Sequence, residues 1–150
     1  MSARNTISIL ISQESSEPKR VTEVPWYPGI TVLQAMVIAQ SMDPGSFSFR
    51  VLYHSFYGAF VDMIDGVTDA DPKYWTVSVS NNPLPVGVSE AIVLEERQGE
   101  NVEIEWRFGI PEADDAAQAS RKTAARRRSE HLMPFTADMW NIFTPSATAL

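Results

Sequence analysis

Apolar and polar residues alternate along most of the first hundred positions, with the period of two that marks half-buried β-strands. The segment 102–108 shows this most clearly, because Val, Ile, Trp and Phe alternate there with two Glu and one Arg. A shorter strand is expected at 20–24, and the same period recurs in four other segments, 6–11, 47–54, 59–64 and 75–80. These patterns predict a domain that consists mainly of strands.

One segment, 31–41, has the pattern of a helix. Thr31 and Gln34 have the spacing of a capping box, in which each side chain binds a backbone N–H that the first turn leaves free. Positions 32–39 are apolar apart from Gln34, so the helix is apolar on almost every side and one sheet cannot cover it. We expect the C-terminal arm or a partner subunit to cover Val32 and Met36; the alternative is that these side chains face water.

Strands on both sides of a single helix predict an α+β fold, in which a mixed sheet has one helix packed across it. The composition changes at Gly109-Ile110-Pro111, so we expect a domain over residues 1–108 and a C-terminal arm over residues 109–150. The arm should begin with a helix at about 112–130, because acidic residues lie near its start and three arginines near its end.

The arm has the composition of an interaction segment. Its helix contains almost no large apolar residue, whereas the residues after it are rich in the aromatic and Met side chains that are enriched at protein interfaces. The alternative is a tail that folds back on its own domain. We expect contacts with a partner through Arg126, Arg127, Leu132, Met133, Phe135, Met139, Trp140 and Phe143.

The order of short motifs over residues 5–108 resembles the transcobalamin-like C-terminal domain family, a β-grasp-like module. The motifs are Thr-Val-Leu-Gln-Ala-Met at 31–36, Tyr-Gly-Ala-Phe-Val at 57–61, Ile-Asp-Gly at 64–66, Tyr-Trp at 74–75 and Gly-Val at 87–88. The resemblance implies a β-grasp-like sheet. In the vitamin B12 carriers that contain the module, it covers a corrinoid held against a separate all-helical domain, which we do not find in this sequence.

The resemblance makes a corrinoid-like compound the candidate ligand. Its binding residues would be the aromatic residues Tyr53, Tyr57, Tyr74 and Trp75. The alternative for Tyr74 and Trp75, which follows from their residue type, is burial in the core, where most aromatic side chains lie.

Composition and charge exclude several other classes. The chain has no cysteine and two histidines, so disulfides and thiolate sites are absent and a zinc site or a His-based triad has few candidate residues. The net charge of -7 falls on residues 1–108, which disfavours binding to nucleic acid or to an anionic membrane. No apolar run reaches the ~20 residues of a membrane span. We expect a soluble cytoplasmic protein.

The candidate chemistry is sparse. Asp62, Asp65, Asp69 and Asp71 surround a turn, but they lack the spacing of a calcium loop and are expected to be solvated. His54 lies on the polar face of its strand. We therefore expect no catalytic residue, no metal and no cofactor, apart from the corrinoid named above.

Two functions from different classes remain open. The first is a non-catalytic accessory or scaffold subunit that docks to a larger intracellular protein, such as an enzyme complex, or to a second copy, through its helix and its arm. The second is a small-ligand binding module.

Overall fold

The computed structural model describes residues 4–94, 99–113 and 115–131, with side chains as far as residue 124. The described residues form mainly strands and two helices, which confirms the predicted α+β class. In chain order the elements are β1 (Thr6–Gln13), β2 (Ser16–Pro25), α1 (Val32–Met42), β3 (Phe49–His54), β4 (Gly58–Ile64), β5 (Val67–Thr68), β6 (Tyr74–Val79), β7 (Asn82–Pro83), β8 (Asn101–Gly109) and α2 (Ala116–His131).

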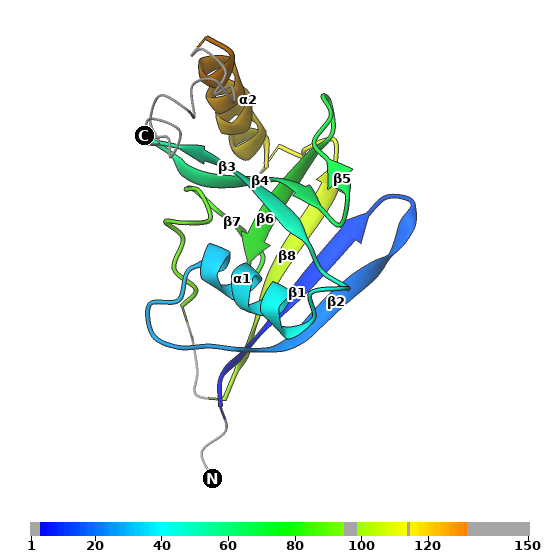
Figure 1. Ribbon diagram of the computed structural model, residues 1–150, viewed down its shortest axis with the longest axis vertical. Coiled ribbons are helices and arrows are strands. Elements are labelled where there is room, and N and C mark those ends of the chain that lie inside the picture. The colour runs from blue at the N-terminus through cyan, green and yellow to red at the C-terminus, as the bar shows by residue number, and fades with distance from the viewer. Residues whose placement is uncertain (1–3, 95–98, 114, 132–150) are drawn as a thin grey trace, which may run out of the picture.

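A five-stranded mixed sheet forms the centre of the fold, with the strand order β2-β1-β8-β6-β7 (Figure 1). β1 and β8 run parallel, and the other neighbours run antiparallel. The three isoleucines of β1 lie opposite Val102, Ile104 and Trp106 of β8, and all six side chains are buried. The alternation predicted for 102–108 therefore has its apolar face in the core.

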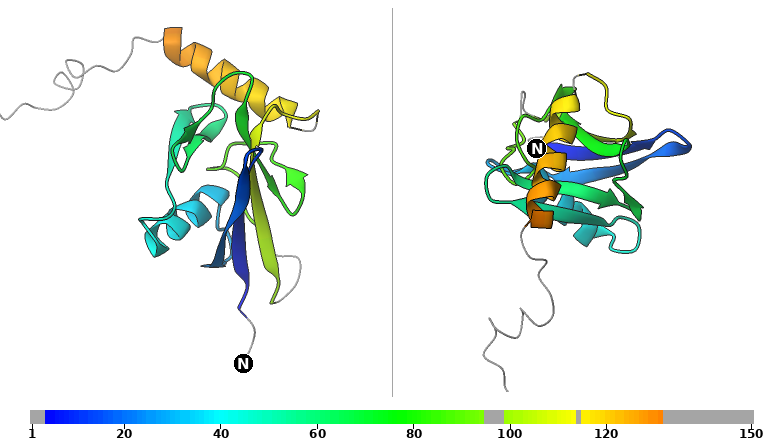
Figure 2. Two further views of the ribbon diagram at one scale, coloured as in Figure 1. Left: turned by 90° about the vertical axis from the view of Figure 1, so that its right-hand side faces the viewer. Right: turned by 90° about the horizontal axis from the view of Figure 1, so that it is seen from above.

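The strands β3, β4 and β5 form a second sheet, whereas the sequence patterns predict a single one. These strands pair with their neighbours in the chain, so the second sheet consists of local antiparallel hairpins. Figure 2 shows this sheet and α1 on the same side of the five-stranded sheet. The strands β5 and β7 were not predicted, because two residues are too few to show a period.

The helix α1 begins where the capping box predicts. Gln34 N donates to Thr31 Oγ1 at 3.1 Å, and Thr31 N donates to Gln34 Oε1 at 2.9 Å. Gln34, Val37 and Ser41 are exposed on its outer side. The helix buries Val32, Ala35, Met36 and Ala39.

The segment 88–93 of the same domain contacts the start of α1, in addition to the sheet. Val32 N donates to Ala91 O at 2.9 Å, and Leu33 N donates to Val88 O at 3.0 Å. Val32 and Met36, the helix residues expected to face a partner, are fully buried in this core, so their side chains reach no outer surface. The cover expected over Val32 therefore comes from residues late in its own domain.

The helix α2 crosses over the ends of the central strands (Figure 2). It begins at Ala116, a few residues later than predicted, and buries Gln118 and Lys122 against the domain, so this part of the arm does not stand free in solvent. Arg126 and Arg127 lie in α2, but their side chains are outside the described part. Neither described helix is long and apolar enough to cross a membrane. The predicted contacts in the tail, Leu132, Met133, Phe135, Met139, Trp140 and Phe143, lie outside the described residues.

Candidate functional site

The end of β3 and the turn that follows it present aromatic side chains to solvent. Tyr53, in β3, is 73% exposed and Phe56, in the turn, is 79% exposed, while Tyr57 beside them is half-buried. We call these three residues the aromatic tip. Large apolar side chains so exposed at one end of a hairpin are typical of a binding surface.

Hydrogen bonds within the turn hold the tip in one conformation. His54 pairs with Gly58 across the hairpin, and Gly58 has a φ of 82°, which a residue with a Cβ adopts only with strain. The Nδ1 atom of His54 accepts from the backbone N–H groups of Phe56 and Tyr57, each at 3.1 Å. The Tyr57 ring stacks on the His54 ring with 5.0 Å between centroids, and the Phe56 ring meets Tyr57 edge-on.

The segment 87–89 fixes the base of the tip from the other side. Gly87 N donates to Tyr57 O at 3.1 Å, and Val88 N donates to Ala59 O at 2.8 Å. Ala59 N in turn donates to Ser89 Oγ at 2.9 Å. A Cβ at Gly87 would lie 2.5 Å from Tyr57 O, so only glycine allows this approach. The tip is therefore preorganised before anything binds to it.

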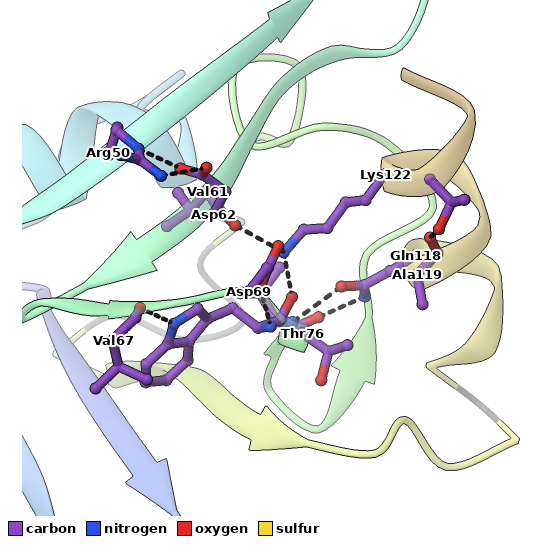
Figure 3. Close-up of polar contacts among 12 residues, drawn as sticks. Arg50, Val61, Asp62, Val67, Asp69, Thr76, Gln118, Ala119 and Lys122 are labelled. Atoms are coloured by element: carbon purple, nitrogen blue, oxygen red, sulfur yellow. Dashed lines mark hydrogen bonds and ion pairs between the residues drawn. The ribbon is translucent and has the colours of Figure 1, made fainter. Parts of the chain in front are cut away.

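Apart from the aromatic tip, a cluster of polar side chains lies between the two sheets and under α2 (Figure 3). Its centre is Lys122, whose Nζ lies 3.0 Å from Asp69 Oδ2 and donates to Val61 O at 2.6 Å and to Trp75 O at 2.5 Å. The side chains of Lys122 and Asp69 are 3% and 0% exposed. One ammonium group thus joins β4, β6 and the connection before β6.

Side chains also complete the edge of β6 that faces away from β8. Gln118 accepts from Val77 N at 2.9 Å and donates to Val77 O at 2.7 Å, in place of a neighbouring strand. Asp69 Oδ1 accepts from Trp75 N at 2.6 Å. Because these buried groups have hydrogen-bond partners, we assign the cluster a structural role.

The prediction of solvated aspartates is wrong for Asp62 and Asp69, whereas Asp71 is exposed as expected. Asp62 is buried and accepts two hydrogen bonds from Arg50, at 3.0 and 2.8 Å, and this hydrogen bonding raises the pKa of Arg50. Asp69 is buried with Lys122, and Asp65 pairs with Lys19 at 3.0 Å. Within residues 4–94, 99–113 and 115–131, no group of three His, Asp or Glu side chains is placed to hold a metal ion.

The four aromatic residues predicted as a ligand site do not share one surface. Tyr53 and Tyr57 lie on the aromatic tip, but Trp75 is fully buried, where its Nε1 donates to Val67 O at 2.7 Å. Tyr74 is half-buried at the start of β6, where it pairs with Gly109. Trp75 thus takes the core position that strand alternation predicts.

Sequence reasoning missed Phe56 and misplaced His54. Phe56 lies in a turn without periodicity, so its only signal is an aromatic pair immediately before a glycine and between two strand patterns. His54 was expected on the polar face of its strand, but its ring turns over the hairpin and is only 9% exposed.

The described surface also has a groove of mixed character near the start of α2. Its volume is about 180 Å³, and its lining combines charged side chains such as Glu14, Arg107 and Glu112 with the apolar Phe108, Ile110 and Pro111. A hydrogen bond to Glu105 raises the pKa of Arg107. The groove contains none of the aromatic tip, and it is smaller than the ~300–1,000 Å³ typical of small-molecule sites.

Two solved structures share a related fold with this chain. Haptocorrin in complex with Cbi matches 71% of the chain at 25% identity, with a TM-score of 0.52, and the match spans only 25% of the haptocorrin chain. A protein from Ruminococcus gnavus ATCC 29149, described as a candidate metal binding protein, matches 72% of this chain and 99% of its own chain, with a TM-score of 0.50 and 10% identity. No protein-family model matches the sequence, and no curated protein is significantly similar to it.

Proposed function

We propose that this chain is a non-catalytic accessory module that docks onto a larger protein, with the aromatic tip as its docking surface. The observation that carries the proposal is the exposure of Tyr53, in β3, and of Phe56, on a turn that hydrogen bonds hold in place. Aromatic anchors dominate the binding energy of many interfaces. A preorganised turn also loses little conformational entropy when it binds.

The family is part of the same proposal. We infer a transcobalamin-like, β-grasp-like module from the motifs quoted above. The parallel pairing of β1 with β8 and the likeness to haptocorrin support this inference. The match covers about a quarter of the haptocorrin chain, so the module there belongs to a much larger chain.

The test is a tip variant, Tyr53→Ser with Phe56→Ser, compared with Leu94→Ser. Leu94 is similarly exposed, at 72%, but lies elsewhere in the chain, so it controls for the loss of exposed apolar area. We expect the tip variant to lose the partner in chemical cross-linking with mass spectrometry, and to keep the wild-type unfolding midpoint. Equal loss in the Leu94 variant, or an unchanged complex in the tip variant, contradicts the proposal.

Size-exclusion chromatography with light scattering separates a foreign partner from a second copy. If the purified chain self-associates and the tip variant does not, the partner is another copy of the chain. If both are monomers, the partner is a different protein.

A corrinoid-like ligand is the second candidate, and the haptocorrin structure in complex with Cbi is the observation that favours it. The exposed ring of Phe56 could then lie against one face of the flat macrocycle. Isothermal titration of the purified chain with Cbi tests this directly. Saturable binding that the tip variant loses supports the ligand; no binding to either protein leaves docking as the function.

A further inference from the structure

The hydrogen bonds in the tip fix the protonation state of His54. A backbone N–H group can only donate, so the Nδ1 atom that receives Phe56 N and Tyr57 N acts as an acceptor and carries no proton. The ring is therefore neutral and carries its proton on Nε2. Two backbone groups of the tip depend on this single lone pair.

Adding a proton to Nδ1 would remove that acceptor. The imidazolium ring has N–H donors on both nitrogens, so Nδ1 would then face two other donors at 3.1 Å. His54 is nearly buried and stacks on Tyr57, so the ring can relieve this conflict by flipping about its Cβ–Cγ bond or by leaving its position. Either movement takes the acceptor away from the N–H groups of Phe56 and Tyr57.

We propose that His54 is a pH-sensitive switch, and that its protonation releases the turn that presents Phe56 and Tyr57. An imidazole ordinarily changes charge between pH 5 and 8, whereas phenols and carboxylates ordinarily titrate outside that interval. The neutral ring orders the tip, and the imidazolium form loosens it.

The other ionisable groups around the turn do not replace this acceptor. Tyr53 and Tyr57 belong to the same hairpin, and Arg50 and Asp62 form their ion pair further along β3 and β4. From the segment packed against the hairpin, Glu90 approaches Gly58, with Oε1 3.7 Å from the position of a Cβ there. None of these side chains has a described hydrogen bond to the N–H of Phe56 or Tyr57.

Nuclear magnetic resonance of the full chain tests the switch without any partner. At pH 8 the nitrogen shifts of the His54 ring should show the Nε2–H tautomer. Between pH 8 and 5 the amide signals of Phe56 and Tyr57 should move with the same midpoint as the ring. Their hydrogen-exchange protection factors should fall about tenfold, the equivalent of one to two lost hydrogen bonds, while those of β8 stay constant.

Two substitutions separate the acceptor from the ring. In His54→Asn the carboxamide oxygen can accept from the same two amides, as Asn does in Asx turns, and it does not titrate. Protection of Phe56 and Tyr57 should then be independent of pH. In His54→Phe the ring remains but the acceptor is lost, so protection should be low at both pH values; unchanged β8 signals confirm that either variant is folded.

Three results overturn the switch: an Nδ1–H tautomer at pH 8, ring titration without a response of the two amides, or the wild-type pH response in His54→Asn. The consequence for binding rests on the proposed function. Binding to the tip should weaken about tenfold from pH 7 to 5 in the wild type, but not in His54→Asn. If the amides respond and binding does not, the switch stands and the tip is not the docking surface.

Discussion

Lys122 illustrates, at the scale of single residues, how a buried charge can connect segments that no backbone ladder joins. Its ammonium group contacts a carbonyl on β4, a carbonyl on β6 and the Asp69 carboxylate. Removing one partner of a buried pair costs much more than the intact pair contributes, because the remaining charge stays buried without compensation. Stability should therefore respond strongly to this one position.

We expect Lys122→Met to lower the free energy of unfolding by about 3–5 kcal/mol, because the Asp69 carboxylate would stay buried without its cation. Urea denaturation followed by Trp fluorescence measures the change. Arg121→Met is the matched control: it removes a cation from the neighbouring, half-buried position of α2 and should change stability by about 0.5 kcal/mol or less.

A double-mutant cycle identifies the ion pair as the cause. Asp69→Asn keeps an acceptor for Trp75 N but removes the charge. In this background Lys122→Met should cost clearly less than in the wild type. Equal costs in both backgrounds would show that Lys122 acts only through the carbonyl groups.

At the scale of elements, two local contacts fix backbone positions. One is the close approach of residues 87–89 to the aromatic tip, and the other is the cap of α1. The first brings backbone within van der Waals distance of backbone, so no side chain can rotate away to make room. The second satisfies two N–H groups at the helix start. Each contact predicts a different response to a small substitution.

Gly87→Ala should destabilise the protein by about 3 kcal/mol, the upper end of overpacking effects, because its Cβ would meet backbone oxygens at 2.5 and 2.7 Å. Amide signals of the tip should shift with it. Gly45→Ala is the control, since its Cβ would have only Asp43 Oδ1 at 4.0 Å, and its midpoint in thermal unfolding should stay near that of the wild type.

Thr31→Ala should lower the free energy of unfolding by about 1 kcal/mol through loss of the helix cap. Chemical denaturation measures this, and Ser41→Ala, on the exposed last turn of α1, is the comparison. A cost in Ser41→Ala as large as in Thr31→Ala would argue against the capping box as the source.

A helix or strand was predictable from sequence where its own residues carry a recognisable pattern. The capping box located α1, and alternation located the strands of five or more residues. The split into two sheets was not predictable, because alternation within a strand shows which side chains face the core and not which strands pair. The aromatic tip was only partly visible: Tyr53 and Tyr57 stood out by type, whereas Phe56 has no pattern around it.

At the scale of the whole molecule, the two sheets differ in the interactions that hold their strands in the fold. β1 and β8 lie in the middle of the larger sheet, with strands on both sides and buried isoleucines between them and α1. The smaller sheet has no described backbone ladder to the larger one and is joined to it by side chains and by the 87–89 segment. Stability should not be uniform across such a structure.

Native-state hydrogen exchange should resolve this difference. We expect the amides of β1 and β8 to exchange only through global unfolding, and those of β3 and β4 through a smaller opening with a lower free energy and a weaker dependence on denaturant. One common free energy and denaturant slope in all four strands would mean that the two sheets unfold as a single unit.

The pairing of β1 with β8 also matters while the protein is being synthesised. Thr6 and Asn101 are neighbours in the sheet although 95 positions separate them in the chain. Until the ribosome has released β8, β1 has only β2 beside it, and a lone two-stranded hairpin is marginally stable in water. The nascent chain must therefore carry β1 with one unpaired edge until late in the synthesis of the domain, and the larger sheet is complete only when β8 leaves the exit tunnel.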